Sequence, residues 1–179
     1  MQKRLLTTLL ILFVGLDLAF TFWRNYNLPL DGDLAAVVLP SPWYTQVLHD
    51  PFGWAVISRN EVYAATNRFF VHAETGLYWK VVPRLLRHVV DPIRSLYLAS
   101  ALFNTLVQAA LIFVLAKYIE LASDAPRGRF WLIAALLVPL FQTAAGSYEQ
   151  IGVTDRAVNY TFAYALAMLL VLGLLWPFV

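Results

Sequence analysis

Residues 5–23 read LLTTLLILFVGLDLAFTFW, and this stretch decides the class of protein. It is apolar apart from Asp17 and three threonines. A helix rises ~1.5 Å per residue, so the stretch approaches the length needed to cross a hydrocarbon core of ~30 Å. It is longer than the ~7–15 apolar residues of a signal peptide, and no small-x-small cleavage site follows it. We therefore expect an uncleaved transmembrane helix rather than a removable signal.

Three more apolar stretches follow, and none alternates with a period of two residues. They run from about Ser95 to Leu121, Phe130 to Ala145 and Tyr160 to Val179. Each is close to the ~20 residues that a spanning helix needs, whereas a membrane barrel requires alternation. The sequence therefore predicts an all-α membrane protein with four transmembrane helices. The expected division is residues 1–23, the N-terminus and first span; 24–94, a long external loop; and 95–179, the remaining three spans.

The overall composition agrees with a membrane protein. Of the 179 residues, 60% are hydrophobic and 13% are charged, against about a quarter charged in a typical soluble domain. A small soluble domain exposes too much surface to hide so many apolar side chains, and a disordered chain needs high charge instead. A soluble enzyme and a disordered chain are thus excluded. The net charge of +2 is too mild to indicate a nucleic-acid partner, and the absence of cysteine excludes disulfides and thiolate sites.

The short loops carry an asymmetric charge that predicts the orientation. Lys3 and Arg4 precede the first span, and the link between the second and third spans is flanked by Lys117, Arg127 and Arg129. The link between the third and fourth spans holds Glu149, Asp155 and a single arginine. Cytoplasmic loops are enriched in Lys and Arg. We expect a bacterial inner membrane protein with a cytoplasmic N-terminus and with residues 24–94 in the periplasm.

The long external segment contains signals for two short helices that lie on the membrane surface. Ser41 followed by Pro42 is a typical helix start, and Asp91 with Pro92 is another, at the beginning of the second span. A second helix is expected from about Ala73 to Val90, apolar along one side and basic along much of the other, with Pro83 as a kink. The aromatic residues of this segment are typical of an interfacial belt, or of a platform on which sugar rings stack.

Four carboxylates are the candidate chemical groups outside the membrane. Asp31 and Asp33 flank a glycine just beyond the first span, and Glu149 and Asp155 lie in the other external link. Paired carboxylates can hold one cation or deprotonate a hydroxyl, although Asp-Gly is also ordinary turn chemistry. If all four face one cleft, the cleft is a metal or acid–base site.

Asp17 is the candidate polar residue inside the membrane. Counting inward from the outer ends of the spans places Asp17, Asn104 and Gln142 in the same half of the bundle. A carboxylate at this depth is costly, so we expect the three side chains to form one polar cluster. The cluster either joins helices or belongs to a proton or substrate pathway.

The arrangement of spans and acidic motif resembles the N-terminal part of GT-C superfamily glycosyltransferases. These polytopic enzymes use polyprenyl-phosphate-linked sugars on the outer membrane face and carry an acidic motif in the first external loop, where Asp31-Gly32-Asp33 stands here. The runs Asp50-Pro51-Phe52-Gly53 and Asn67-Arg68-Phe69-Phe70 are similar to multipass proteins of the Bacteroidetes. Such enzymes have about twice as many spans or more, so the resemblance implies that this chain is part of a longer protein.

The resemblance implies roles for the candidate residues. Asp31 or Asp33 is expected to act as general base on an acceptor hydroxyl in an inverting transfer, or as ligand of a divalent cation. Glu149 or Asp155 matches the second acidic motif of some members. Arg68, Arg84 and Arg87 are chosen by position and charge as partners of the lipid phosphate, because guanidinium binds phosphate bidentately.

Two other interpretations remain open from the sequence. One is a non-catalytic accessory subunit whose external loop packs against other membrane subunits of a larger complex. The other is a transporter fragment in which Asp17 relays protons. Both leave membrane lipids as partners, and neither predicts a cofactor.

Overall fold

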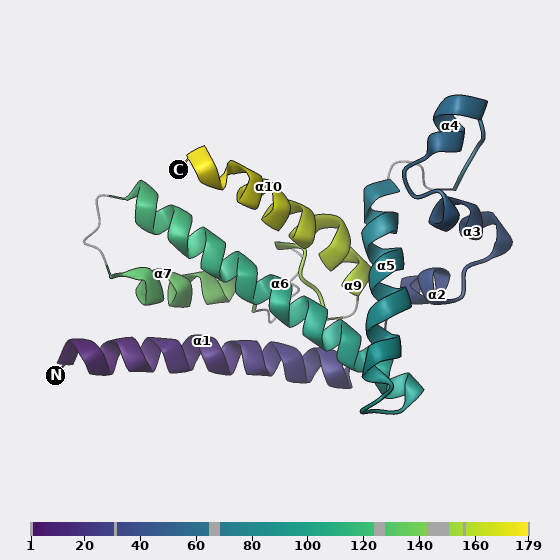
Figure 1. Cartoon of the computed structure of the whole chain (residues 1–179). Coiled ribbons are helices and arrows are strands. Elements are labelled where there is room, and N and C mark those ends of the chain that lie inside the picture. The colour runs from purple at the N-terminus through teal and green to yellow at the C-terminus, as the bar shows by residue number, and fades with distance from the viewer. Residues whose placement is uncertain are drawn as a thin grey trace.

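The computed structural model describes residues 2–30, 32–64, 69–123, 128–142, 151–155 and 157–178. Within these residues the chain is all helical, with no strand. Three helical segments are long and apolar enough to cross a membrane: α1 (Gln2–Asn27), α6 (Pro92–Ala122) and the run Val158–Phe178. The protein is therefore a helical membrane protein. In Figure 1, α1 and α6 converge near the start of α6.

The third expected span is only partly helical in the described residues. Helix α7 (Phe130–Leu137) continues as the 3-10 turn η2 (Val138–Leu140). At ~1.5 Å per residue the stretch Phe130–Leu140 covers about 16 Å, roughly half of a hydrocarbon core. The remainder of the expected span, up to Ala145, lies mostly outside the described residues. The described residues thus hold three helices that are long and apolar enough to span a membrane, and one shorter apolar helix.

The last span is built from consecutive helical segments of different pitch. They are α9 (Val158–Tyr160), the π-helical turn η3 (Thr161–Leu166), α10 (Ala167–Leu175) and the 3-10 turn η4 (Trp176–Phe178). Gly152, with a φ of +76°, lies directly against this π-turn. A Cβ at position 152 would lie 2.6 Å from Cβ of Tyr164, so the close approach requires glycine there.

The spans pack around an apolar core, but α1 contributes mostly polar groups to its buried face. Its buried residues are Val14, Asp17, Thr21 and Asn25, whereas its leucines and phenylalanines are mainly exposed. The apolar core is formed by α6, α7 and the last span, with Leu111, Phe141 and Ala165 fully buried. This inverted pattern is typical of a helix whose outer surface faces lipid.

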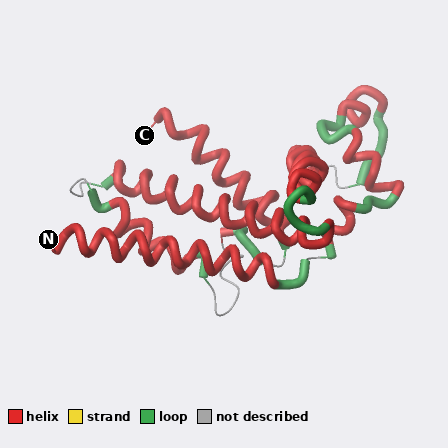
Figure 2. The backbone as a smooth tube through the Cα atoms, turned by 60° about the horizontal axis from the view of Figure 1, so that its bottom comes forward, coloured by secondary structure: helices red, strands yellow, loops and turns green. Residues whose placement is uncertain are grey.

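Residues 33–86, which we call the cap, lie beyond one end of the spans, and their described part (33–64 and 69–86) contains four helices. They are α2 (Asp33–Val38), α3 (Pro42–His49), α4 (Trp54–Arg59) and α5 (Phe69–Leu86). Figures 1 and 2 show α5 crossing the direction of α1 and α6, with α3 and α4 on its far side. The cap joins the bundle through an apolar cluster that includes Leu34, Trp79 and Phe162.

The helix starts expected from the sequence are confirmed, and one helix range is corrected. Ser41 caps α3 with Pro42 in the first turn, and the Asp91 carboxylate accepts hydrogen bonds from the amides of Ile93 and Arg94 at the start of α6. The helix expected over Ala73–Val90 instead runs from Phe69 to Leu86. It ends earlier because residues 87–90 form turns ahead of Pro92, which cannot continue a preceding helix.

Candidate functional site

A cavity of about 200 Å³ lies within the cap, where α2, α3, α5 and the start of the last span meet. Asp33 stands at its exposed rim, in the first turn of α2. Its wall is completed by apolar and polar side chains from the four elements: Ala36, Val37, Tyr44, Val71, His72, Thr75, Asn159 and Ala163. A concave site with few polar groups on apolar walls is typical of small-molecule binding.

A tyrosine–histidine pair closes one side of this cavity. The hydroxyl of Tyr44 on α3 and Nε2 of His72 on α5 are hydrogen-bonded at 2.6 Å, and their rings meet edge to face. His72 is buried, as is Thr75 one turn later on the same helix. The pair joins two helices that the sequence separates by a long connection, so it fixes the shape of the cavity wall.

Some residues that line this cavity carry buried polar atoms without a hydrogen-bond partner among the described residues. Examples are Oγ1 of Thr75, a residue 3% exposed, and Oδ1 of Asn159. Buried polar atoms are normally satisfied, because leaving one without a partner is destabilising. The cavity is therefore suited to a molecule that brings hydrogen-bonding groups, either a ligand or water.

A second hollow, which we call the basic groove, adjoins the cavity along α5. It measures about 360 Å³ and is lined by Lys80, Arg84 and Arg87 of α5, by His49 at the end of α3 and by Ser95 of α6. Val37 of α2 lines both hollows. No acidic side chain is among the described residues that line the groove, so its charge favours an anion.

An exposed apolar stripe runs along α5 beside these basic residues. Leu77, Val81 and Leu85 recur at intervals of four residues, and all three are exposed. The basic residues Lys80 and Arg84 lie one position before Val81 and Leu85, on the neighbouring face of the helix. This combination is the one expected of a helix at a membrane surface.

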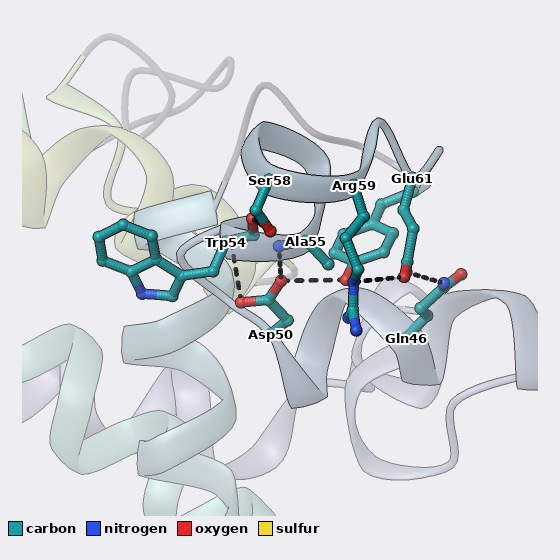
Figure 3. A network of polar contacts seen from close by, with 8 residues as sticks. Gln46, Asp50, Trp54, Ala55, Ser58, Arg59 and Glu61 are labelled. Atoms are coloured by element: carbon teal, nitrogen blue, oxygen red, sulfur yellow. Dashed lines mark hydrogen bonds and ion pairs between the residues drawn. The ribbon is translucent and has the colours of Figure 1, made fainter.

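Asp50 organises the outer part of the cap (Figure 3). Its carboxylate accepts hydrogen bonds from the amides of Trp54 and Ala55, at 3.1 and 2.9 Å, and from the hydroxyl of Tyr63 at 3.0 Å. These bonds, with the Ala55 amide foremost, hold the pKa of Asp50 below its ordinary value. Burial and the nearby Asp50 raise the pKa of Tyr63 to about 12. The motif at residues 50–53 thus stabilises the turn between α3 and α4.

The expected single cluster of Asp17, Asn104 and Gln142 is only partly right. Asp17 meets Gln142 and also Gln108, which was not predicted, whereas Asn104 hydrogen-bonds to a different set of groups. Gln108 donates from Nε2 to Oδ2 of Asp17 at 2.9 Å, and Gln142 donates to the other carboxylate oxygen and, at 3.4 Å, to Thr21. Asp17 and Gln142 therefore meet as expected. Gln108 was detectable in principle, because it follows Asn104 by one helical turn and so shares its face.

Asn104 belongs to a neighbouring set of contacts. Its Nδ2 donates to Oδ1 of Asn25 at 2.5 Å and to the carbonyl of Thr154 at 2.6 Å. It thus ties α1 and α6 to the short segment before the last span. We call this column of buried polar groups between α1 and α6 the polar seam; its members are Asp17, Thr21, Asn25, Asn104 and Gln108.

The other predicted site residues fall in different places. Asp33 lines the cavity, and Arg84 and Arg87 line the basic groove. Asp155 instead forms an ion pair with Arg24 at 2.5 Å, at the end of α1. Asp31, Arg68 and Glu149 lie outside the described residues, so the expected meeting of four carboxylates is not tested. Within the described residues there is no group of three metal-ligating side chains.

Comparison of the chain with protein-family models, with curated proteins and with solved structures finds no match.

Proposed function

We propose that this chain is part of a membrane glycosyltransferase-like protein that moves a sugar from a polyprenyl-phosphate carrier to an acceptor on the outer membrane face. The single observation that carries the proposal is the adjacency of two hollows of opposite character on α5. One has Asp33 at its rim, and the other is lined by Lys80, Arg84 and Arg87. A phosphate-linked sugar requires such a pair, a basic place for the phosphate and a polar cavity beside it.

The proposed topology has four spans in the bacterial inner membrane, with a cytoplasmic N-terminus and residues 24–94 in the periplasm. Support comes from the distribution of Lys and Arg in the short links. Further support comes from the exposed stripe Leu77, Val81 and Leu85, which suits a helix lying in the outer membrane surface. An isoprenoid chain whose phosphate is bound in the basic groove would pack against the same apolar stripe.

The proposed chemistry assigns binding and proton transfer to different side chains. Arg84 and Arg87 would hold the phosphate, because guanidinium groups pair with phosphate through two hydrogen bonds. A carboxylate of the pair Asp31 and Asp33 would take the proton of the acceptor hydroxyl as its oxygen bonds to the anomeric carbon. The bond between that carbon and the phosphate oxygen breaks at the same time, and the polyprenyl phosphate leaves as the anion held by the arginines.

The proposal is tested by binding a short-chain polyprenyl phosphate to the purified protein in nanodiscs. We expect Arg84→Gln combined with Arg87→Gln to weaken binding by about tenfold or more, as expected for the loss of charge-assisted hydrogen bonds. Arg59→Gln is the matched control, since Arg59 is also an exposed cap arginine but pairs with Glu61 away from the groove. Equal binding by the double variant and the control would overturn the proposal.

A transporter is the second candidate, and the polar seam is the observation that favours it. Asp17 is a carboxylate within a span, hydrogen-bonded to two glutamines, and intramembrane carboxylates often mark proton pathways. In that case Asp17→Asn would abolish proton-coupled uptake into vesicles while leaving binding of the polyprenyl phosphate unchanged. In the glycosyltransferase-like proposal, by contrast, binding of the polyprenyl phosphate depends on Arg84 and Arg87.

A further inference from the structure

We infer that the basic groove binds a diphosphate, with Arg84 and Arg87 on one phosphate group and Lys80 on the other. The inference rests on the proposed function for the sugar and the isoprenoid chain, and it makes the carrier group a diphosphate instead of a single phosphate. Two kinds of ligand share this chemistry, an isoprenoid diphosphate and a nucleoside diphosphate. The exposed apolar stripe along α5 favours the isoprenoid, because a nucleoside has no chain to pack against it.

The three cations of the groove lie in one row along α5. Lys80, Arg84 and Arg87 are separated by four and then three residues, a spacing that places them on the same face of a helix. None of the three forms an ion pair with a described residue, and no acidic side chain is among the described residues that line the groove. A diphosphate brings more negative charge than one phosphate in the same linkage, so it balances this row more fully.

Distances along α5 assign the three side chains to two phosphate groups. Arg84 and Arg87 are less than one turn apart, about 4.5 Å along the axis, so both guanidinium groups can engage one phosphate. Lys80 lies about 6 Å before Arg84, on the side of the cavity. A phosphate held between the arginines leaves Lys80 without an anion, and a second phosphate linked to the first supplies it.

The position of the cavity is a second reason for two phosphate groups. Thr75 lines the cavity, and Arg84 lies about 13–14 Å farther along the axis of α5. Lys80 lies between them, about 7–8 Å from Thr75 along the same axis. A phosphate beside Lys80 covers part of this distance, so a sugar in the cavity can remain linked to a carrier held at the arginines.

A buried donor also belongs to a residue that lines the groove. Trp79 is 6% exposed, and its Nε1 has no hydrogen-bond partner among the described residues. An indole nitrogen only donates hydrogen bonds, so the group that would satisfy it is an acceptor. This donor and the three cations therefore favour the same class of ligand, an oxyanion rich in acceptor atoms.

The inference is tested by calorimetry on the full chain in phosphatidylcholine nanodiscs at pH 7, with the heats of empty nanodiscs subtracted. Farnesyl diphosphate is compared with farnesyl phosphate, which has the same chain and one phosphate group fewer. We expect the diphosphate to bind about tenfold more tightly, the factor for one additional charge-assisted contact. Uridine diphosphate, which has no isoprenoid chain, should bind more weakly than farnesyl diphosphate.

Variants assign the preference to Lys80. Lys80→Gln should bring the affinity ratio of the two farnesyl ligands towards one and change the affinity for farnesyl phosphate little, whereas Lys80→Arg keeps the charge and should retain most of the ratio. Lys3→Gln is the matched control, because Lys3 is an exposed lysine of α1 at the end of the bundle away from the cap (Figure 1). Lys80 is exposed, so its replacement should leave the unfolding temperature unchanged, which excludes misfolding as the cause.

The outcomes for the two proposals are distinguishable. Equal binding of the two farnesyl ligands, with both weakened by Arg84→Gln and Arg87→Gln, overturns the diphosphate site and leaves the phosphate groove standing. Binding of uridine diphosphate as tight as that of farnesyl diphosphate, and lost in Lys80→Gln, supports the diphosphate site and contradicts the polyprenyl carrier. An affinity ratio that persists in Lys80→Gln would show that the second phosphate lies away from Lys80 and would overturn the inference.

Discussion

Gln108 of α6 donates a 2.9 Å hydrogen bond to the carboxylate of Asp17 of α1, between residues 91 positions apart in the chain. Both side chains are buried, and Gln108 is fully so. The bond therefore links the first two spans at a depth where water is scarce, and an unsatisfied carboxylate would be costly. It is the contact around which the polar seam is organised.

Replacing Gln108 by leucine should destabilise the bundle. The substitution removes one of the two glutamine donors to Asp17, and we expect a loss of about 1–2 kcal/mol in the free energy of unfolding. Leu106→Ala is the control, since Leu106 is an exposed residue of the same helix. Denaturant titration in mixed micelles measures both. Equal stability of the two variants would show that the hydrogen bond contributes nothing.

The ion pair between Arg24 and Asp155 should stabilise the junction of α1 with the segment before the last span. Asp155 keeps 10% of its side chain exposed, so the pair is shielded from much of the solvent. Arg24→Gln leaves that carboxylate without its cation and should cost about 1–3 kcal/mol. The charge-reversed double variant, Arg24→Asp with Asp155→Arg, should recover part of the loss in a thermal unfolding experiment. If the stability losses of the two single variants simply add up in the double variant, the two side chains do not interact directly.

Acid should loosen the α3–α4 part of the cap through Asp50. Its pKa is lowered in the folded protein, so its contribution to stability is present above the ordinary pKa and is lost as the pH falls through the lowered value. Exchange protection of the Trp54 and Ala55 amide protons should therefore exceed that of Asp50→Asn at pH 6. The difference should vanish in strong acid. A difference that is independent of pH would exclude titration of Asp50 as the cause.

Tyr63 should ionise only in strong alkali. Its pKa is raised to about 12 by burial and by the neighbouring Asp50 carboxylate. An ultraviolet difference titration between the native protein and Tyr63→Phe isolates this phenol from the other tyrosines. We expect Asp50→Asn to lower the midpoint, because it removes the negative charge. Ionisation of the native phenol near pH 10 would show that Tyr63 is not held against Asp50.

Two glycines should respond in opposite ways to alanine. Gly152→Ala should destabilise by about 1–3 kcal/mol, because its φ is positive and the new Cβ would lie 2.6 Å from Tyr164 and 3.0 Å from the Ala165 amide nitrogen. Gly15→Ala in α1 meets no heavy atom within 4 Å and should be neutral or stabilising by up to about 1 kcal/mol. Thermal unfolding in detergent compares them. Similar results for both would mean that the π-turn does not restrict position 152.

Local sequence is enough to predict that the helices lie in lipid and where several of them begin. Apolar stretches around Asp17 and Asn104 require lipid, and Ser41 and Asp91 determine where α3 and α6 begin, because caps act through local hydrogen bonds. The meeting of Asp17 with Gln142 also followed from depth along the helix axis. These features depend on spacing within one segment or on distance from the membrane surface.

Which side chains face one another depends instead on how the helices pack. Nothing in the linear order pairs Tyr44 with His72, Gln108 with Asp17, or Arg24 with Asp155, because each pair depends on how two separate helices rotate and cross. The same packing places Asp33 at the rim of one hollow and Arg84 in the next. Helix rotation is set by the sum of many apolar contacts, which no short stretch of sequence contains.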